Sequence, residues 1–83
     1  MLKMYTTTWC PDCRRAKRFL ADRHIAFEEI NIEETPGADV LVREHNQGKA
    51  RVPTFDLEGR YFASSPFDPV QLARDLQAAL KLS

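Results

Sequence analysis

The sequence predicts an α/β fold in which a four-stranded mixed sheet carries helices on both faces. Three observations support this prediction: two leading strand-helix units, a later pair of short strands joined by a Glu-Gly turn, and an amphipathic C-terminal segment. Two successive β-α units give parallel strands through right-handed crossovers, and a hairpin adds antiparallel strands. The expected order is therefore β-α-β-α-β-β-α. Because 83 residues support a single hydrophobic core, we expect one domain covering residues 1–83.

The first unit begins with a short apolar stretch followed by threonines, which predicts a strand over 2–6. From 12 to 24, apolar residues recur at helical spacing, and basic and acidic residues fill the other face. After a turn, partial alternation and β-branched residues predict the second strand over 27–32.

The second helix has a proline at its expected start. Thr35 is the predicted N-cap and Pro36 the first helical residue, and an Asn-Gln-Gly stop ends the helix within 46–48. The next strand, over 52–57, begins at a Val-Pro pair, and a tight turn joins it to a strand over 60–63.

The last helix follows a loop with two prolines. Asp68 is the predicted N-cap, Pro69 the first helical residue, and apolar residues at helical spacing continue to Leu80. The chain shows no repeat, low-complexity tract or linker, which agrees with a single domain.

Cys10 and Cys13 lie three residues apart and straddle the start of the first helix. Both sulfurs can then lie on one side of the first turn, close enough to bond. Cys10 faces the free N–H groups and the positive end of the helix, which favour its thiolate. Cys13 lies inside the turn and suits the resolution of a mixed disulfide. Pro11 fixes φ where no N–H is needed, whereas Asp12 opposes the thiolate charge.

A zinc site is the alternative interpretation of this cysteine pair. Structural zinc needs four ligands, and the chain offers only His24 and His45 as further imidazoles, at spacings that do not match a zinc finger. A cysteine pair before a helix in a β-α unit is the redox context. We therefore predict reactive thiols and no metal site.

The charge pattern and hydropathy exclude several classes of function. Twelve basic and twelve acidic residues cancel, which gives no support for binding to nucleic acid or to an anionic membrane. No apolar run approaches the roughly 18–20 residues of a membrane span, and the N-terminal residues lack the pattern of a signal peptide. We expect a cytoplasmic protein.

The sequence resembles the glutaredoxin family. The resemblance is carried by residues 5–13, which read Tyr-Thr-Thr-Thr-Trp-Cys-Pro-Asp-Cys, by the segment Val52-Pro53-Thr54-Phe55, and by the hairpin at Gly59. It covers essentially the whole chain. It implies a thioredoxin-like fold, a cis peptide before Pro53, and reduction of disulfides or of mixed disulfides with a small thiol.

The resemblance also assigns roles to the redox segment. It makes Cys10 the nucleophile and Cys13 the resolving cysteine. A cis peptide would turn the backbone of Val52 toward the redox pair, where it pairs with an extended thiol substrate as in strand addition. Trp9 is expected to be partly exposed and to shield the site or contact substrates; simple packing against the loop is the alternative.

The chain departs from the family at its glutathione contacts. Asp12 stands where the family usually has tyrosine. Glutaredoxins often carry a lysine near the position of Thr7, and residues 63–66 stand where the family has a Gly-Gly and Asp segment. Arg51 and the two following loop serines remain candidates to contact a thiol carboxylate. The predicted substrate- or thiol-binding residues are Trp9, Pro11, Asp12, Arg51, Val52, Pro53, Ser64 and Ser65.

The segment 64–69 is similar to two subgroups: mycoredoxins, which act with mycothiol, and glutaredoxin-like electron donors of ribonucleotide reductase, which thioredoxin reductase recharges. The resemblance therefore implies a monomer with a redox-active disulfide and no tightly bound cofactor. Electrons would come from glutathione, from another low-molecular-weight thiol or from a reductase, and disulfide-containing proteins would be the substrates. A dedicated electron donor to a reductase is one alternative. A metal- or cluster-binding module is another, which Pro11 and Cys13 disfavour.

Overall fold

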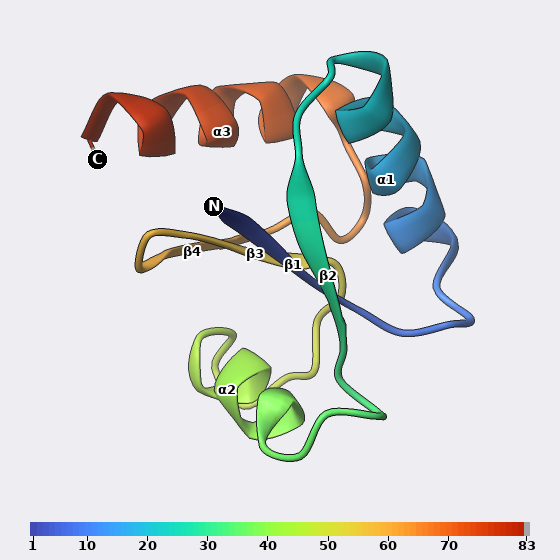
Figure 1. The fold of residues 1–83 in the computed structure, drawn as a ribbon. Coiled ribbons are helices and arrows are strands. Elements are labelled where there is room, and N and C mark those ends of the chain that lie inside the picture. The colour runs from blue at the N-terminus through green and yellow to red at the C-terminus, as the bar shows by residue number, and fades with distance from the viewer. Residues whose placement is uncertain (83) are drawn as a thin grey trace.

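A computed structural model describes residues 1–82 of the chain and confirms the predicted order of elements (Figure 1). In chain order these are β1 (Leu2–Thr6), α1 (Pro11–Asp22), β2 (Phe27–Asn31), α2 (Ala38–Glu44), β3 (Thr54–Leu57), β4 (Arg60–Ala63) and α3 (Pro69–Leu82). None of the helices among these residues is long and apolar enough to cross a lipid bilayer.

The four strands form one mixed sheet in the order β2-β1-β3-β4. Strand β1 pairs with β2 in parallel, with Tyr5 opposite Ile30, and with β3 in antiparallel, with Tyr5 opposite Thr54. Helices α1 and α3 cover one face and α2 covers the other (Figure 1). The two inner strands are therefore buried on both sides, and Met4 and Phe55 are fully inaccessible to solvent.

Helix α2 begins later and ends earlier than predicted. Its N-cap is Gly37, whose φ of 85° lies in the left-handed region that glycine tolerates, so Thr35 and Pro36 belong to the preceding turn. The helix ends at Glu44, and the Gly48 N–H donates to the Arg43 carbonyl at 2.8 Å across the following turn. The predictions of a Thr35 cap and of a C-terminus within 46–48 are thus wrong.

The other boundaries differ from prediction by one or two residues. Helix α1 includes Pro11 and ends at Asp22, two residues before the predicted end. Strand β2 ends at Asn31, one residue early. Strand β3 starts at Thr54, because the Val-Pro pair before it lies outside the sheet ladder.

The start of α3 agrees with the prediction. The Asp68 carboxylate accepts hydrogen bonds from the N–H groups of Val70, at 2.9 Å, and Gln71, at 3.3 Å, as an N-cap does. Phe67 packs edge-on against Phe19 of α1, with ring centroids 6.1 Å apart, and so joins the start of α3 to α1. Leu72, Leu76 and Ala79 of α3 are buried, whereas Val70 and Leu80 are exposed.

Candidate functional site

Cys10 is the N-cap of α1. Its backbone is extended, with φ −84° and ψ 112°, and Pro11 takes the first helical position, where no N–H is needed. The Cys10 Sγ accepts a hydrogen bond from the Cys13 N–H at 3.0 Å. The sulfur therefore lies at the positive end of the helix dipole and receives one of its unpaired N–H groups. Its residue is only 5% exposed, so solvent screens this interaction little.

Cys13 lies in the first turn of α1 and is only 1% exposed. Both cysteines are free thiols. Burial raises the pKa of the Cys13 thiol to about 12, and a hydrogen bond with the Cys10 side chain and the negative charge of Cys10 add to this shift; a backbone hydrogen bond from Thr7 acts in the opposite direction. The Cys13 thiol is therefore suited to keep its proton in the reduced protein.

The Val52–Pro53 peptide bond is cis, as the resemblance implied. The Val52 carbonyl oxygen lies 3.6 Å from the Cys10 Sγ and accepts its S–H. The Pro53 carbonyl accepts the Ser64 N–H at 3.0 Å, which ties this segment to the loop after β4. The Ser65–Pro66 bond in that loop is also cis, which sequence reasoning did not predict.

The structure groups the candidate carboxylate-binding residues in a small pocket of about 300 Å³ next to this segment. Arg51, Ser64 and Ser65 line it together with Asp68 and Gln71. The Arg51 guanidinium donates to the Ser65 carbonyl, and Ser64 is buried. Arg51 is thus held across the loop before any ligand arrives.

The other predicted binding residues lie around the start of α1. Trp9 is 68% exposed, so simple packing against the loop does not describe it. Its indole Nε1 is 3.5 Å from a Glu33 carboxylate oxygen. Pro11 is exposed, and the half-buried Asp12 accepts from Arg15 at 3.3 Å. Asp12 is therefore occupied by a neighbouring charge of its own helix.

Sequence reasoning missed a larger pocket, of about 590 Å³, beside Trp9. We call it the acidic pocket; the residues used below are Thr7, Trp9, Glu33, Glu34, Asp39 and Arg43. A signal for it was present in the sequence. The carboxyl ends of parallel strands meet at one edge of a sheet, so the loop containing Trp9 and the acidic pair that follows β2 had to lie close together.

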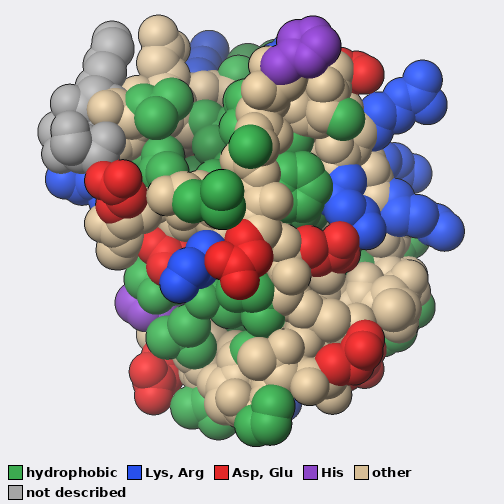
Figure 2. Space-filling view, viewed as in Figure 1, with side chains coloured by type: hydrophobic (Ala, Val, Ile, Leu, Met, Phe, Trp, Pro, Cys, Tyr) green, Lys and Arg blue, Asp and Glu red, His purple; other side chains and the backbone are tan. Residues whose placement is uncertain are grey.

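The two flanks of the redox pair carry opposite charge. Helix α1 presents Lys and Arg side chains on one side, as Figure 2 shows. Arg15 and Lys17 bind carboxylates, at 3.3 and 3.0 Å, whereas Arg14 and Arg18 contact no carboxylate within residues 1–82. The acidic pocket lies on the other flank.

In the described part of the chain, no three His, Cys, Asp or Glu side chains are grouped as metal ligands. Cys10 contacts both Cys13 and the backbone carbonyl of Val52. The site therefore provides two thiols and a carbonyl at one helix N-terminus.

Comparison with known proteins agrees with this geometry. The profile of the glutaredoxin family matches residues 2–62. The chain belongs to the glutaredoxin family. A protein of Mycobacterium tuberculosis described as a putative glutaredoxin is 42% identical over 53 residues, which cover 64% of this chain and 63% of that relative. The match thus spans somewhat less than two thirds of that relative's length.

Other relatives share more of the chain. The glutaredoxin-like protein NrdH of Lactococcus lactis is 38% identical over 74 residues, which cover 89% of this chain and 97% of that protein. The NrdH-redoxin structure from Escherichia coli superposes with a TM-score of 0.72 at 27% identity, covering 88% of this chain and 91% of that one. Glutaredoxins and NrdH proteins are thiol–disulfide oxidoreductases with the thioredoxin-like fold. This chain has the same fold.

Proposed function

We propose that this protein is a dithiol thiol–disulfide oxidoreductase in which Cys10 is the nucleophile and Cys13 the resolving cysteine. The observation that carries the proposal is the placement of the Cys10 sulfur as N-cap of α1, 3.0 Å from the Cys13 N–H. A sulfur in this position is stabilised as the attacking thiolate.

In the first step the Cys10 thiolate attacks one sulfur of a target disulfide. A Cys10–substrate disulfide forms, the target S–S bond breaks, and the other target sulfur leaves as a thiolate that takes a proton from water. The backbone N–H and carbonyl of Val52 would align an extended substrate segment beside Cys10. The distance of 3.6 Å from the Val52 carbonyl oxygen to the Cys10 sulfur supports this role.

In the second step Cys13 attacks the Cys10 sulfur. The Cys10–Cys13 disulfide forms, the substrate leaves as its second thiolate, and two electrons have passed to the substrate. Two of the causes that raise the Cys13 pKa are the hydrogen bond with Cys10 and the charge on Cys10. Once Cys10 is in the mixed disulfide, its sulfur carries neither a proton nor a negative charge. Both causes are then absent, so Cys13 loses its proton more readily at the step in which it attacks.

A second candidate concerns the electron source. We propose that thioredoxin reductase recharges the disulfide and that the protein serves as an electron donor to a reductase such as ribonucleotide reductase. The NrdH relatives support this, and the Escherichia coli protein is described as having a thioredoxin-like activity profile. The carboxylates of the acidic pocket also repel glutathione, a tripeptide thiol that carries two carboxylates of its own. We place this chemistry in the cytoplasm, where thiols are kept reduced.

The test is reduction of a protein disulfide by the wild-type protein and by two serine variants. We expect Cys10→Ser to abolish turnover and Cys13→Ser to retain the first attack but to accumulate the mixed disulfide, seen by mass spectrometry. Full activity in Cys10→Ser would refute the mechanism. Coupling the assay either to thioredoxin reductase or to glutathione with its reductase identifies the electron source, and a faster glutathione-coupled rate would refute the second candidate.

A further inference from the structure

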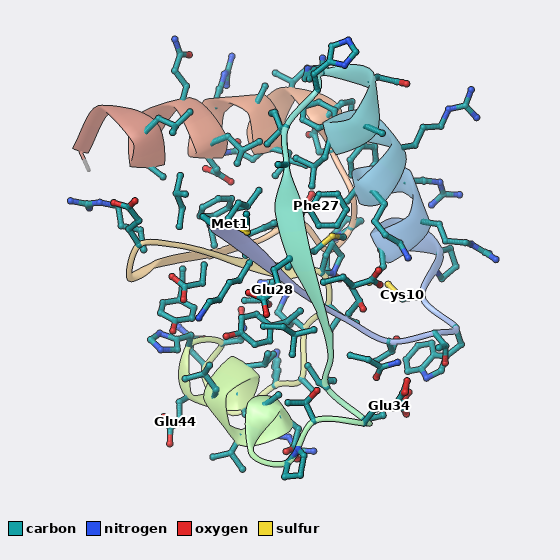
Figure 3. The ribbon with its side chains drawn as sticks, viewed as in Figure 1. Met1, Cys10, Phe27, Glu28, Glu34 and Glu44 are labelled. Carbon is teal, nitrogen blue, oxygen red and sulfur yellow. The ribbon has the colours of Figure 1, made fainter. Side chains whose placement is uncertain are left out.

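The acidic pocket opens beside the redox pair. Trp9, which directly precedes Cys10, forms one wall, and the segment after β2 forms another. Figure 3 shows Cys10 and Glu34 on the same side of the molecule, in the segments that follow the neighbouring strands β1 and β2. A substrate segment bound at Cys10 therefore lies within a few residues' reach of this pocket.

The pocket has an excess of negative charge. Three carboxylates line it, those of Glu33, Glu34 and Asp39, against a single guanidinium from Arg43. Arg43 is already paired with Asp39 at 3.2 Å. Glu33 accepts only from the Trp9 indole and Glu34 only from an asparagine amide, so neither meets a Lys or Arg side chain within residues 1–82. Two carboxylates are thus left without a cation.

The exposed indole of Trp9 adds a second feature of the same kind. Trp9 lines the pocket, and its Nε1 points to Glu33. An indole face attracts a cation most strongly among the aromatic side chains, and the neighbouring Glu33 carboxylate adds a negative charge beside it. An indole and a carboxylate joined in this way form a receptor for an ammonium or guanidinium group.

An independent observation comes from Thr7. This residue is only 6% exposed and lines the pocket, and its Oγ1 is buried without a hydrogen-bond partner in the described part of the chain. Leaving a buried hydroxyl unpaired is unfavourable, so such groups call for an explanation. A bound N–H donor would supply the missing partner.

We propose that the acidic pocket binds a Lys or Arg side chain of the protein substrate, placed two or three residues from the cysteine that Cys10 attacks. The inference rests on the proposed exchange function and specifies its substrate class. The charge on α1 is opposite, because Arg14 and Arg18 have no carboxylate partner among residues 1–82. These cations keep a uniformly basic segment from binding equally well in every register.

The first test is a single-turnover reaction, which needs no external reductant. The pre-reduced protein is mixed with short peptides whose cysteine is joined by a disulfide to a neutral fluorescent thiol. The peptides differ only in carrying Lys or Glu two residues before or two residues after that cysteine. In the better register we expect the Lys peptide to react about tenfold faster than its Glu counterpart at low ionic strength, and the ratio to shrink as salt rises.

Matched charge variants locate the effect. Glu33→Gln with Glu34→Gln removes two charges from the pocket and is expected to lower the Lys-to-Glu ratio below about twofold. Glu28→Gln with Glu44→Gln removes the same charge from exposed residues that do not line the pocket, and is expected to keep the ratio. Equal rates for the two peptides in the wild type, or the same ratio in both double variants, would overturn the inference while leaving the exchange function intact. Reduction of neither peptide would overturn both.

A second test is independent of redox chemistry. Trp9 is the only tryptophan of the chain, so its fluorescence reports on this pocket alone. The same peptides with serine in place of cysteine are titrated into the reduced protein. A saturable change with the Lys peptide that is weaker with the Glu peptide supports the proposal, and no change with either overturns it.

Discussion

The N-cap role of Cys10 predicts that a serine, but not an alanine, at this position preserves the stability of the reduced protein. Serine retains a side-chain acceptor for the Cys13 N–H, which now donates to the Cys10 sulfur at 3.0 Å. Alanine leaves that N–H unpaired at a buried helix end. Both substitutions remove the proposed nucleophile, so we expect equal loss of activity but different stability.

The expected difference follows from the single hydrogen bond lost. Removal of an N-cap acceptor costs about 1 kcal/mol. For a domain of this size, about 1 kcal/mol corresponds to a shift of about 6 °C in Tm. Cys10→Ala is therefore expected to melt about 6 °C below Cys10→Ser.

Thermal and urea unfolding of the reduced proteins at neutral pH measure this difference. Cys13 provides the matched control, because it is also buried but its sulfur caps no helix. There the order should reverse, since a serine would place a hydroxyl among apolar side chains and alanine would not. Equal stability of Cys10→Ser and Cys10→Ala would show that the side chain at this position does not cap α1.

Two further predictions concern Thr7 and Cys13. Thr7→Val replaces a buried hydroxyl that has no partner within residues 1–82 with a methyl of similar shape, and is expected to raise the free energy of unfolding by about 1 kcal/mol; a loss in urea unfolding would mean that the hydroxyl is satisfied in solution. The second follows from the Cys13 pKa, which burial raises from 9.0 to about 12. Between pH 9 and about 12, the folded protein keeps the Cys13 proton that the unfolded chain loses. The contribution of this proton to the free energy of unfolding is therefore fully present below pH 9 and is lost as pH rises through about 12. The urea midpoint of reduced wild type should therefore fall more steeply over this range than that of Cys13→Ala, and parallel curves would contradict the assigned cause.

Local sequence signals determined the order of elements and placed the cysteine pair at the start of α1. Helical spacing after Cys10, the Pro11 that opens α1, and the Asp68 cap of α3 act within a few residues, so the chain alone reveals them. The ends of an element do not follow from the sequence where local signals compete. Before α2, the left-handed backbone of Gly37 ends the turn and overrides the cap that Thr35 would have supplied.

The partners of the redox pair depended on tertiary structure. The Cys10 sulfur and the Val52 carbonyl are 42 residues apart in the sequence, and no local pattern sets the distance between them. The same holds for the pocket in which Trp9 meets Glu33, because strand pairing between β1 and β2 brings those loops together. The sequence therefore identified the two thiols and their helix. Packing of distant strands decided which groups surround them, since charge and hydrogen-bond partners depend on proximity in space rather than on spacing along the chain.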